Sequence, residues 1–150
     1  VNRRENAQLF SEVLIGLQCP HSLVVHGSDG MDEITLSGET HVVEQKSGVV
    51  REYTLEPGEF GIERVEATRL TLPDKASAIK MAQAFLAGEA PKAHENLVLL
   101  NAGAGLYVAG QVASITDGLA LARQTVHSGA ARQKLEQVVA YTAAHKVPAA

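Results

Sequence analysis

The segment with the clearest capacity for chemistry is an acidic, glycine-containing stretch at residues 26–33, with the sequence HGSDGMDE. It ends in two adjacent carboxylates, Asp32 and Glu33. Magnesium prefers hard oxygen ligands, usually one or two carboxylates whose coordination shell is completed by water and substrate phosphates. The glycines at positions 27 and 30 would allow the backbone to approach a ligand closely. Asp32 and Glu33 are therefore candidate Mg²⁺ ligands, and a solvated acidic turn is the alternative interpretation.

Three further groups could bind a ligand, and each has a structural alternative. His26 could act as a general base or contact a phosphate, whereas a hydrogen-bonded histidine at a strand end is the structural interpretation. Cys19 and His21 could share a metal ion, but two ligands without further partners form a weak pattern. The glycine-rich residues 101–105, NAGAG, precede no lysine and follow no strand pattern, which favours close helix packing over phosphate binding. Asn101 is expected to be buried, with partners for its amide.

The residues before the acidic stretch predict a strand that leads into it. Residues 23–25, LVV, form a short apolar run without alternation, which is typical of a strand buried on both faces in an α/β sheet. In open α/β sheets ligands bind beyond the carboxyl ends of strands, which is where residues 26–33 would lie. Upstream, the apolar positions of residues 10–17 are spaced as one stripe of a helix, which Pro20 would end.

The remaining elements are a predicted hairpin and a series of helices. Residues 40–44 and 49–55 carry β-branched side chains on either side of residues 46–48, which predicts a hairpin with a three-residue loop. Residues 34–36 could form a very short strand. Helical spacing and small apolar residues predict four helices after the hairpin. They lie at residues 78–85, 94–110, 115–126 and 135–142, the last before Pro148. A capping box marks the start of the third.

Composition narrows the possible classes of protein. The 150 residues are 45% hydrophobic and 20% charged, which excludes wholesale disorder and fits one domain or a large part of one. The formal net charge of −4 disfavours a generic nucleic-acid surface. The single cysteine excludes an intramolecular disulfide framework and fits a reducing compartment, so we expect a cytoplasmic protein. No apolar run reaches the ~18 residues of a membrane span, and there is no secretory signal pattern.

The order of the predicted elements is unusual for a complete domain. A strand buried on both faces needs parallel neighbours that helices cover, and the sequence contains too few candidates for them. The chain also starts at Val1 rather than at a methionine. We therefore expect residues 1–150 to be the C-terminal portion of an α/β domain whose other strands lie upstream.

Three segments together resemble anthranilate phosphoribosyltransferase, and their order and spacing agree with that family. Residues 26–33 are similar to its H-G-x-x-G-x-D-E loop. Residues 56–61, EPGEFG, are similar to the connector P-x-D-F-G that follows, with Glu59 in place of the aspartate. Residues 101–110, NAGAGLYVAG, resemble its N-A-G-A-A-L-Y-V-A-G helix, with Gly105 in place of an alanine. The resemblance covers essentially the whole chain.

This resemblance implies both a fold and a reaction. The implied fold is the C-terminal part of an α/β domain of the phosphoribosyltransferase and nucleoside-phosphorylase type, with a small hairpin and several helices. In the implied reaction, a step of tryptophan biosynthesis, the amino group of anthranilate attacks C1 of phosphoribosyl pyrophosphate (PRPP). The family's D-E pair, here Asp32 and Glu33, would hold the magnesium ion that neutralises the leaving pyrophosphate.

Several of the family's other segments have no counterpart in these 150 residues. They are the glycine-rich pyrophosphate loop, the K-H-G-N and N-x-S segments, the arginine-bearing anthranilate region and the N-terminal helical domain that usually forms the dimer. We therefore expect this chain alone not to catalyse the transfer. For the complete enzyme we expect a homodimer, with neither nucleic acid nor a membrane as a partner.

Two other functions remain open at this point. A pyrimidine nucleoside phosphorylase shares the architecture, but it uses phosphate and does not need the D-E pair. A non-catalytic relative that binds nucleic acid would need a basic surface stripe and would show a steep dependence of binding on salt.

Overall fold

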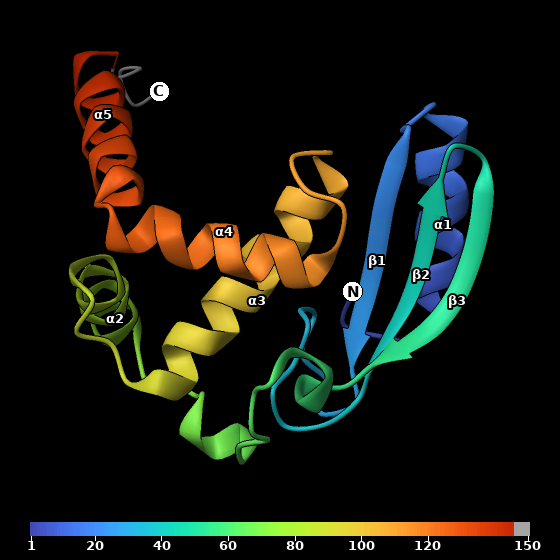
Figure 1. The fold of residues 1–150 in the computed structure, drawn as a ribbon, viewed down its shortest axis with the longest axis horizontal. Helices are drawn as coiled ribbons and strands as arrows, with labels where there is room; N and C mark the ends of the chain where they lie inside the picture. Colours follow the sequence, from blue (N-terminus) through green and yellow to red (C-terminus); the bar gives the residue numbers. More distant parts are fainter. Residues whose placement is uncertain (146–150) are drawn as a thin grey trace, which may run out of the picture.

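The computed structural model describes residues 1–145, in which a small antiparallel sheet packs among helices (Figure 1). The strands follow one another across the sheet as β1 (His21–Gly27), β2 (Thr40–Lys46) and β3 (Val49–Leu55). The α-helices of the described residues are α1 (Asn6–Gly16), α2 (Lys75–Ala87), α3 (Lys92–Val108), α4 (Ile115–His127) and α5 (Ala130–Ala144). Two short 3₁₀ helices, Pro57–Phe60 and Ala67–Arg69, lie between β3 and α2.

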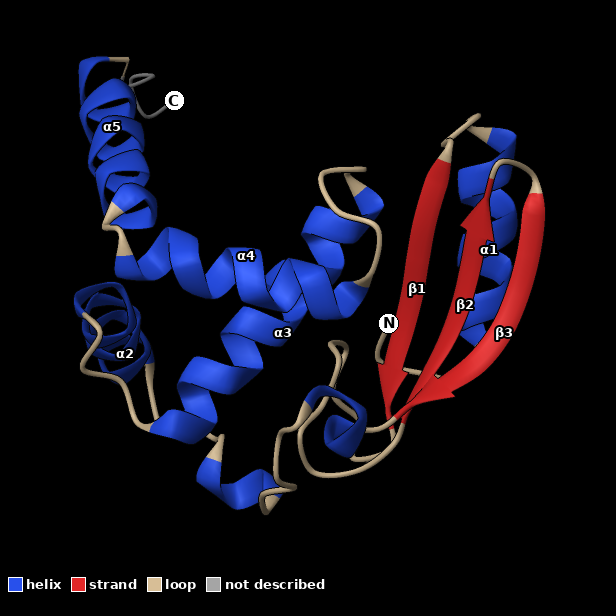
Figure 2. Ribbon diagram, in the orientation of Figure 1, coloured by secondary structure: helices blue, strands red, loops and turns tan. Residues whose placement is uncertain are grey.

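Helix α1 lies against one face of the sheet (Figure 2), and α3 packs against the other. Successive strand residues alternate between two apolar cores. On one face Val24 and Val43 pack against Ala7 of α1. On the other face Val42 joins a larger core that includes Leu100 of α3. α2 and α5 lie side by side at the end of the molecule remote from the sheet (Figure 1). The α/β class is confirmed, as is the burial of the first strand on both faces.

β1 lies at one edge of the sheet within residues 1–145. β1 pairs with β2 and β2 with β3, and both pairs are antiparallel. The other edge of β1 has no strand beside it within residues 1–145, and the parallel neighbours expected upstream of Val1 remain a prediction. α1 contacts one face of the sheet and α3 the other, so helices cover this apolar strand on both faces.

The predicted hairpin is confirmed as β2–β3, with a tighter turn. Lys46 pairs with Val49, so the loop has two residues instead of the predicted three. Ser47 and Gly48 have φ values of 51° and 81°, and a type I′ turn requires positive φ at both central residues. This turn fixes the register of the two strands.

Residues 34–36 are buried, but they do not form the predicted short strand. Their backbone groups find partners outside a strand ladder. The Thr35 N–H donates to the Thr40 hydroxyl oxygen (3.0 Å), and the Leu36 carbonyl accepts the N–H of Val65 (3.0 Å). Since buried backbone groups must be hydrogen-bonded, these contacts allow a loop to lie in the core.

All the predicted helices occur, but in α1 only Leu14 of the predicted apolar stripe packs against a core, and the stripe of α5 packs against no core of residues 1–145. In α1 the small residues Ala7 and Ser11 are buried, whereas Phe10 and Val13 are about half exposed (50% and 52%). The stripe of α5 is likewise exposed. In α1 and α5 the spacing therefore predicts the helix but not which face is buried. Pro148, expected just after the last helix, lies outside the described residues.

Capping side chains define the ends of α2 and α4. The Asp74 carboxylate accepts the N–H of Ser77 at 2.7 Å where α2 begins, and Gly88, with φ of 76°, ends that helix. At the start of α4 the Ser114 hydroxyl oxygen accepts the N–H of Asp117 at 3.1 Å. The predicted stripe of α4 is buried at Ile115, Leu119 and Ala122.

α3 is buried along one face, where Leu99, Leu100 and Ala104 join the larger core. The glycine-rich residues 101–105 lie inside this helix, and Gly103 approaches the backbone of α4. The prediction of close helix packing is confirmed. None of the helices in the described residues combines the length and hydropathy needed to cross a membrane.

Candidate functional site

The loop that follows β1 folds tightly back on itself. The Gly27 N–H donates to the Met31 carbonyl (2.8 Å), and Gly30 turns the chain with φ of 89°. A Cβ at position 27 would lie 3.0 Å from Thr35 Cβ and 2.6 Å from an Asp29 carboxylate oxygen. The side chains of the loop therefore approach the backbone at position 27 closely, which favours glycine there.

Asp29 organises the tip of this loop. Its carboxylate accepts the Met31 N–H (3.1 Å), the Thr35 hydroxyl (2.7 Å) and the Ser37 hydroxyl. Partial burial acts to raise the pKa of Asp29, but the hydrogen bonds from Ser37 and Thr35 outweigh burial and hold the pKa below its ordinary value. Sequence reasoning missed this residue, although an Asp-Gly pair is a known turn signal. The Asp29 carboxylate therefore binds three groups of its own loop.

Asp32 and Glu33 lie between Met31 and Ile34, and in each of these two residues both the backbone N–H and the backbone carbonyl are hydrogen-bonded. Met31 uses its N–H and its carbonyl within the loop, and Ile34 uses both of its groups with α3. The two carboxylate-bearing residues are exposed. No hydrogen bond or ion pair among residues 1–145 engages either side chain. The structure therefore presents both predicted ligands to solvent with their oxygens free.

Asn101 of α3 holds the C-terminal side of this tip. Its Oδ1 accepts the Ile34 N–H at 2.8 Å, and its Nδ2 donates to the Ile34 carbonyl at 2.9 Å. A further bond from Nδ2 to the Leu97 carbonyl (3.0 Å) fixes the amide against its own helix. The prediction that the amide of Asn101 finds partners is confirmed, and the side chain is partly buried.

The carboxylate oxygens of Asp32 and Glu33 suit a hard cation that takes most of its other ligands from water and substrate. No group of three or more His, Cys, Asp or Glu side chains that could hold a metal ion occurs in the described residues. Two adjacent, exposed carboxylates fit Mg²⁺ when water and phosphate oxygens supply the other positions. Asp32 and Glu33 therefore fit part of a magnesium site, whereas residues 1–145 do not form a closed protein cage.

The other candidate ligands bond within the protein. His26, near the end of β1, donates from Nδ1 to the Val1 carbonyl at 2.9 Å, in agreement with the hydrogen-bonded alternative. The Cys19 thiol donates to the His21 carbonyl at 3.2 Å, while the His21 ring contacts Glu44. No third ligand joins Cys19 and His21 in the part of the chain that is described, so a metal ion shared by these two residues is not supported.

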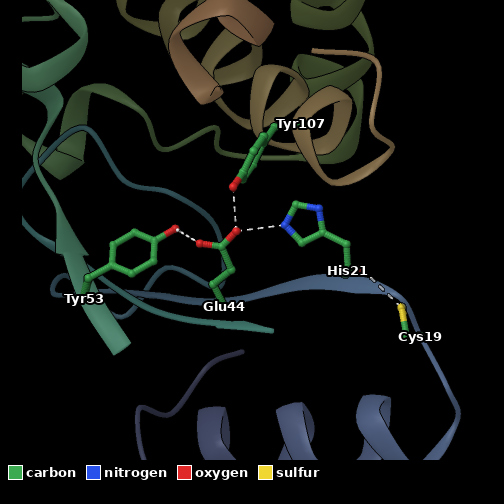
Figure 3. A network of polar contacts seen from close by, with 5 residues as sticks. All are labelled: Cys19, His21, Glu44, Tyr53 and Tyr107. Carbon is green, nitrogen blue, oxygen red and sulfur yellow. Dashed lines mark hydrogen bonds and ion pairs between the residues drawn. The ribbon is translucent and has the colours of Figure 1, made fainter. Parts of the chain in front are cut away.

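A second polar cluster, which sequence patterns did not reveal, joins the sheet to α3 (Figure 3). The Glu44 side chain of β2 is buried, and its carboxylate accepts hydrogen bonds from three neighbours. They are the His21 Nε2 at 2.9 Å, the Tyr53 hydroxyl at 3.0 Å and the Tyr107 hydroxyl at 2.7 Å. The rings of His21 and Tyr107 meet edge to face with centroids 4.7 Å apart. One carboxylate thus ties β1, β2 and β3 to α3.

The pKa shifts in this cluster show that its groups satisfy one another. Burial acts to raise the pKa of Glu44, but the hydrogen bonds from Tyr107, His21 and Tyr53 outweigh burial and lower it. Burial raises the pKa of Tyr53, and the hydrogen bond to Glu44 raises that of Tyr107. With Glu44 ionised and both hydroxyl protons engaged, the cluster is better suited to holding α3 in place than to proton transfer.

Comparison with known sequences gives one consistent result. Residues 1–132 match the glycosyl transferase family, a/b domain. The chain is 46% identical over 134 residues to the anthranilate phosphoribosyltransferase of Thiobacillus denitrificans, a match that covers 89% of this chain and 39% of that protein. It is 45% identical over 139 residues to the enzyme of the same name from Laribacter hongkongensis, covering 93% of this chain and 40% of that protein.

Solved structures agree on the fold. The crystal structure of anthranilate phosphoribosyltransferase from Thermus thermophilus matches with a TM-score of 0.84 at 38% identity, over 94% of this chain and 41% of that chain. The Saccharomyces cerevisiae enzyme in complex with PRPP and Mg matches with a TM-score of 0.75 at 21% identity, over 91% of this chain and 39% of that chain. The second match supports the fold alone, and in both cases the chain spans well under half of the known protein.

Proposed function

Because the chain belongs to the glycosyl transferase family, a/b domain, we propose that the full-length protein transfers the phosphoribosyl group of PRPP to the amino group of anthranilate, in tryptophan biosynthesis. The support is the match to relatives that carry the name of this enzyme, at 46% and 45% identity. The chain spans 39% of the first of these relatives, so the activity is proposed for a longer protein. Residues 1–150 would be the C-terminal portion of its α/β domain.

The observation that carries the proposal is the state of Asp32 and Glu33. Most of the neighbouring polar groups in the loop are bonded to one another, but these two adjacent carboxylates are exposed and engaged by no described residue. Hydrogen-bonded residues on either side, Met31 and Ile34, hold the two carboxylates at this place. The arrangement fits a site at which a cation and a phosphate-bearing substrate complete the coordination.

The proposed reaction requires leaving-group stabilisation more than proton transfer. The C1–O bond of PRPP breaks, pyrophosphate leaves with the bonding electrons, and the anthranilate nitrogen bonds to C1 and loses a proton. A bound Mg²⁺ would neutralise the charge that develops on pyrophosphate. Asp32 and Glu33 would hold this ion from the protein side, and the hydrogen-bonded loop would keep both carboxylates in place. Positioning and electrostatics would then supply most of the catalysis.

The test is a charge-neutralising double substitution, Asp32→Asn with Glu33→Gln, in the full-length protein. Turnover is measured as the fall of anthranilate fluorescence in the presence of PRPP across a range of Mg²⁺ concentrations. We expect a loss of about 100-fold or more at limiting Mg²⁺, because a Lewis acid supplies several kcal/mol of transition-state stabilisation. Glu39→Gln is the matched control, since Glu39 is an exposed acid six positions further along the same loop.

Two results would contradict different parts of the proposal. Unchanged turnover of the double variant at every Mg²⁺ concentration would remove the metal role from Asp32 and Glu33. A wild-type protein that phosphorolyses pyrimidine nucleosides, and does not consume anthranilate, would remove the transferase assignment.

A further inference from the structure

The loop that carries Asp32 and Glu33 is held by a helix that is distant in the sequence. Asn101, 67 residues after Ile34, binds both the N–H and the carbonyl of that residue. A single hydrogen bond fixes the position of a backbone group but leaves rotation about the bond. Two bonds from one planar amide fix the orientation of the Ile34 backbone as well as its place.

The two bonds from Asn101 to Ile34, here called the Asn101 clamp, lie next to the two carboxylates in the chain. Met31 is bonded at its N–H and its carbonyl on one side, and Ile34 at both groups on the other. Only Asp32 and Glu33 lie between these anchors, and neither makes a backbone hydrogen bond within residues 1–145. The directions of their side chains therefore depend on the two anchored residues.

The helix that supplies the clamp is itself firmly placed. The Asn101 amide is fixed to its own helix through the Leu97 carbonyl, and Tyr107, further along α3, bonds to Glu44 of the sheet. Gly103, two residues after the clamp, contacts the backbone of α4. A side chain on such a rigid element can hold a loop more accurately than a side chain on another loop could.

We infer that Asn101 is a positioning residue for the metal site: by binding both backbone groups of Ile34, it sets the directions in which Asp32 and Glu33 offer their oxygens to a divalent cation. This inference rests on the proposed function, since it takes those carboxylates as ligands. Asn101 itself does not contact the cation in this scheme. Loss of a residue that orients metal ligands typically weakens metal binding by about 10- to 100-fold.

The experiment uses Mn²⁺ as a spectroscopic substitute for Mg²⁺ in the full-length protein with PRPP. The dissociation constant of Mn²⁺ is measured by electron paramagnetic resonance for the wild type and for Asn101→Leu, which keeps the shape of the side chain and removes its hydrogen bonds. We expect Mn²⁺ binding to weaken by about 10- to 100-fold. The Mg²⁺ concentration for half-maximal turnover should rise by a similar factor, with a smaller change in kcat at saturating Mg²⁺.

Tyr107→Phe is the matched control for a merely structural effect. It breaks another bond of α3, on the same helix, but it does not touch the loop. We expect it to lower thermal stability and to weaken Mn²⁺ binding far less than Asn101→Leu does. Asn101→Ala provides a second variant, because it removes both bonds to Ile34 and adds no charge near the two carboxylates, so a loss of Mn²⁺ affinity similar to that of Asn101→Leu is expected. This variant decides the question if Asn101→Leu does not fold.

The outcomes separate this inference from the proposed function. A wild-type protein that neither binds Mn²⁺ nor transfers the phosphoribosyl group would contradict the proposed function. A wild-type protein that does both, with an Asn101 variant that folds and binds Mn²⁺ as tightly as the wild type, would overturn the positioning role alone. Equal losses of Mn²⁺ affinity in Tyr107→Phe and the Asn101 variants would also overturn it, because the effect would then be general destabilisation of α3.

Discussion

Gly103 of α3 and Gly118 of α4 meet backbone to backbone where the two helices cross. A Cβ at position 103 would lie 2.5 Å from the Leu119 nitrogen and 2.8 Å from the Gly118 carbonyl carbon. A Cβ at position 118 would collide with the Gly103 carbonyl in return. Both glycines are therefore required for this approach, which brings the buried stripe of α4 onto the helix that carries Asn101.

The first prediction compares Gly103→Ala with Gly105→Ala. Backbone atoms cannot move aside as a flexible side chain can, so Gly103→Ala should force the helices apart and cost about 1–3 kcal/mol of the free energy of unfolding. Gly105 has open space around a built Cβ, and alanine there should add up to about 1 kcal/mol through its higher helix propensity. Urea or thermal unfolding of the full-length protein measures both. Equal effects of the two substitutions would contradict the backbone contact.

The fold was predictable from the sequence where local signals determine it. The hairpin, the capped starts of α2 and α4 and the presence of the helices all follow from patterns within about ten residues. The exposure of Phe10 in α1 and of Val139 in α5 did not follow, because helical spacing shows that a stripe exists and not what packs against it. The sequence predicts a short strand at residues 34–36 because apolar content indicates burial, whereas the partners of Ile34 and Leu36, Asn101 and Val65, are distant in the sequence.

The candidate site, like the fold, was predictable only where its residues lie close together in the sequence. Asp32 and Glu33 stand next to one another in the chain, so their chemistry is visible in the sequence. The clamp from Asn101 to Ile34 spans 67 residues, and the bond from Tyr107 to Glu44 spans 63. Such pairs depend on how a helix packs against the sheet, which a single sequence does not specify. The sequence predicted that the amide of Asn101 would find partners, but not which residue it would hold.

The second prediction concerns the buried carboxylate of Glu44. Its pKa is lowered in the folded protein, so the stability it contributes is complete above the ordinary pKa of a glutamate and is lost as the pH falls through the lower folded value. Glu44→Gln should lower the free energy of unfolding at neutral pH by about 1–3 kcal/mol, because three donors lose their ionised acceptor. The variant should also lose less stability than the wild type on acidification, as measured by thermal unfolding from neutral pH down to about pH 3.

Glu52→Gln provides the control for this measurement. Glu52 lies on the adjacent strand β3, and its side chain is largely exposed beside Arg4 and His41. Exposed ion pairs contribute about 0–1 kcal/mol, so this substitution should change neither stability nor its pH dependence by much. Parallel stability curves for Glu44→Gln and the wild type between neutral and acidic pH would show that the carboxylate charge does not matter to the cluster.

The third prediction is that Asp29→Ala loosens the loop without unfolding the protein. The substitution removes the acceptor of three hydrogen bonds, from Met31, Thr35 and Ser37. Amide hydrogen exchange in residues 28–37 should become faster, whereas exchange in β2 and β3 should be unchanged. Because the pKa of Asp29 is lowered, the wild-type loop should show the same loosening as the pH falls through that pKa. Exchange rates in the loop that are equal in the two proteins at neutral pH would remove Asp29 from this role.

The last prediction concerns the 150-residue chain on its own. Its described residues offer two free carboxylates in the loop and no group of three or more metal-binding side chains, and the chain spans 39% of the Thiobacillus denitrificans relative. We therefore expect no steady fall of anthranilate fluorescence when the purified chain is mixed with PRPP and Mg²⁺, and only weak Mn²⁺ binding by electron paramagnetic resonance. The full-length protein, assayed in parallel, is the positive control. Sustained turnover by the purified chain would mean that residues 1–150 already contain the groups that bind both substrates, and the proposal that other parts of a longer enzyme complete the site would have to be abandoned.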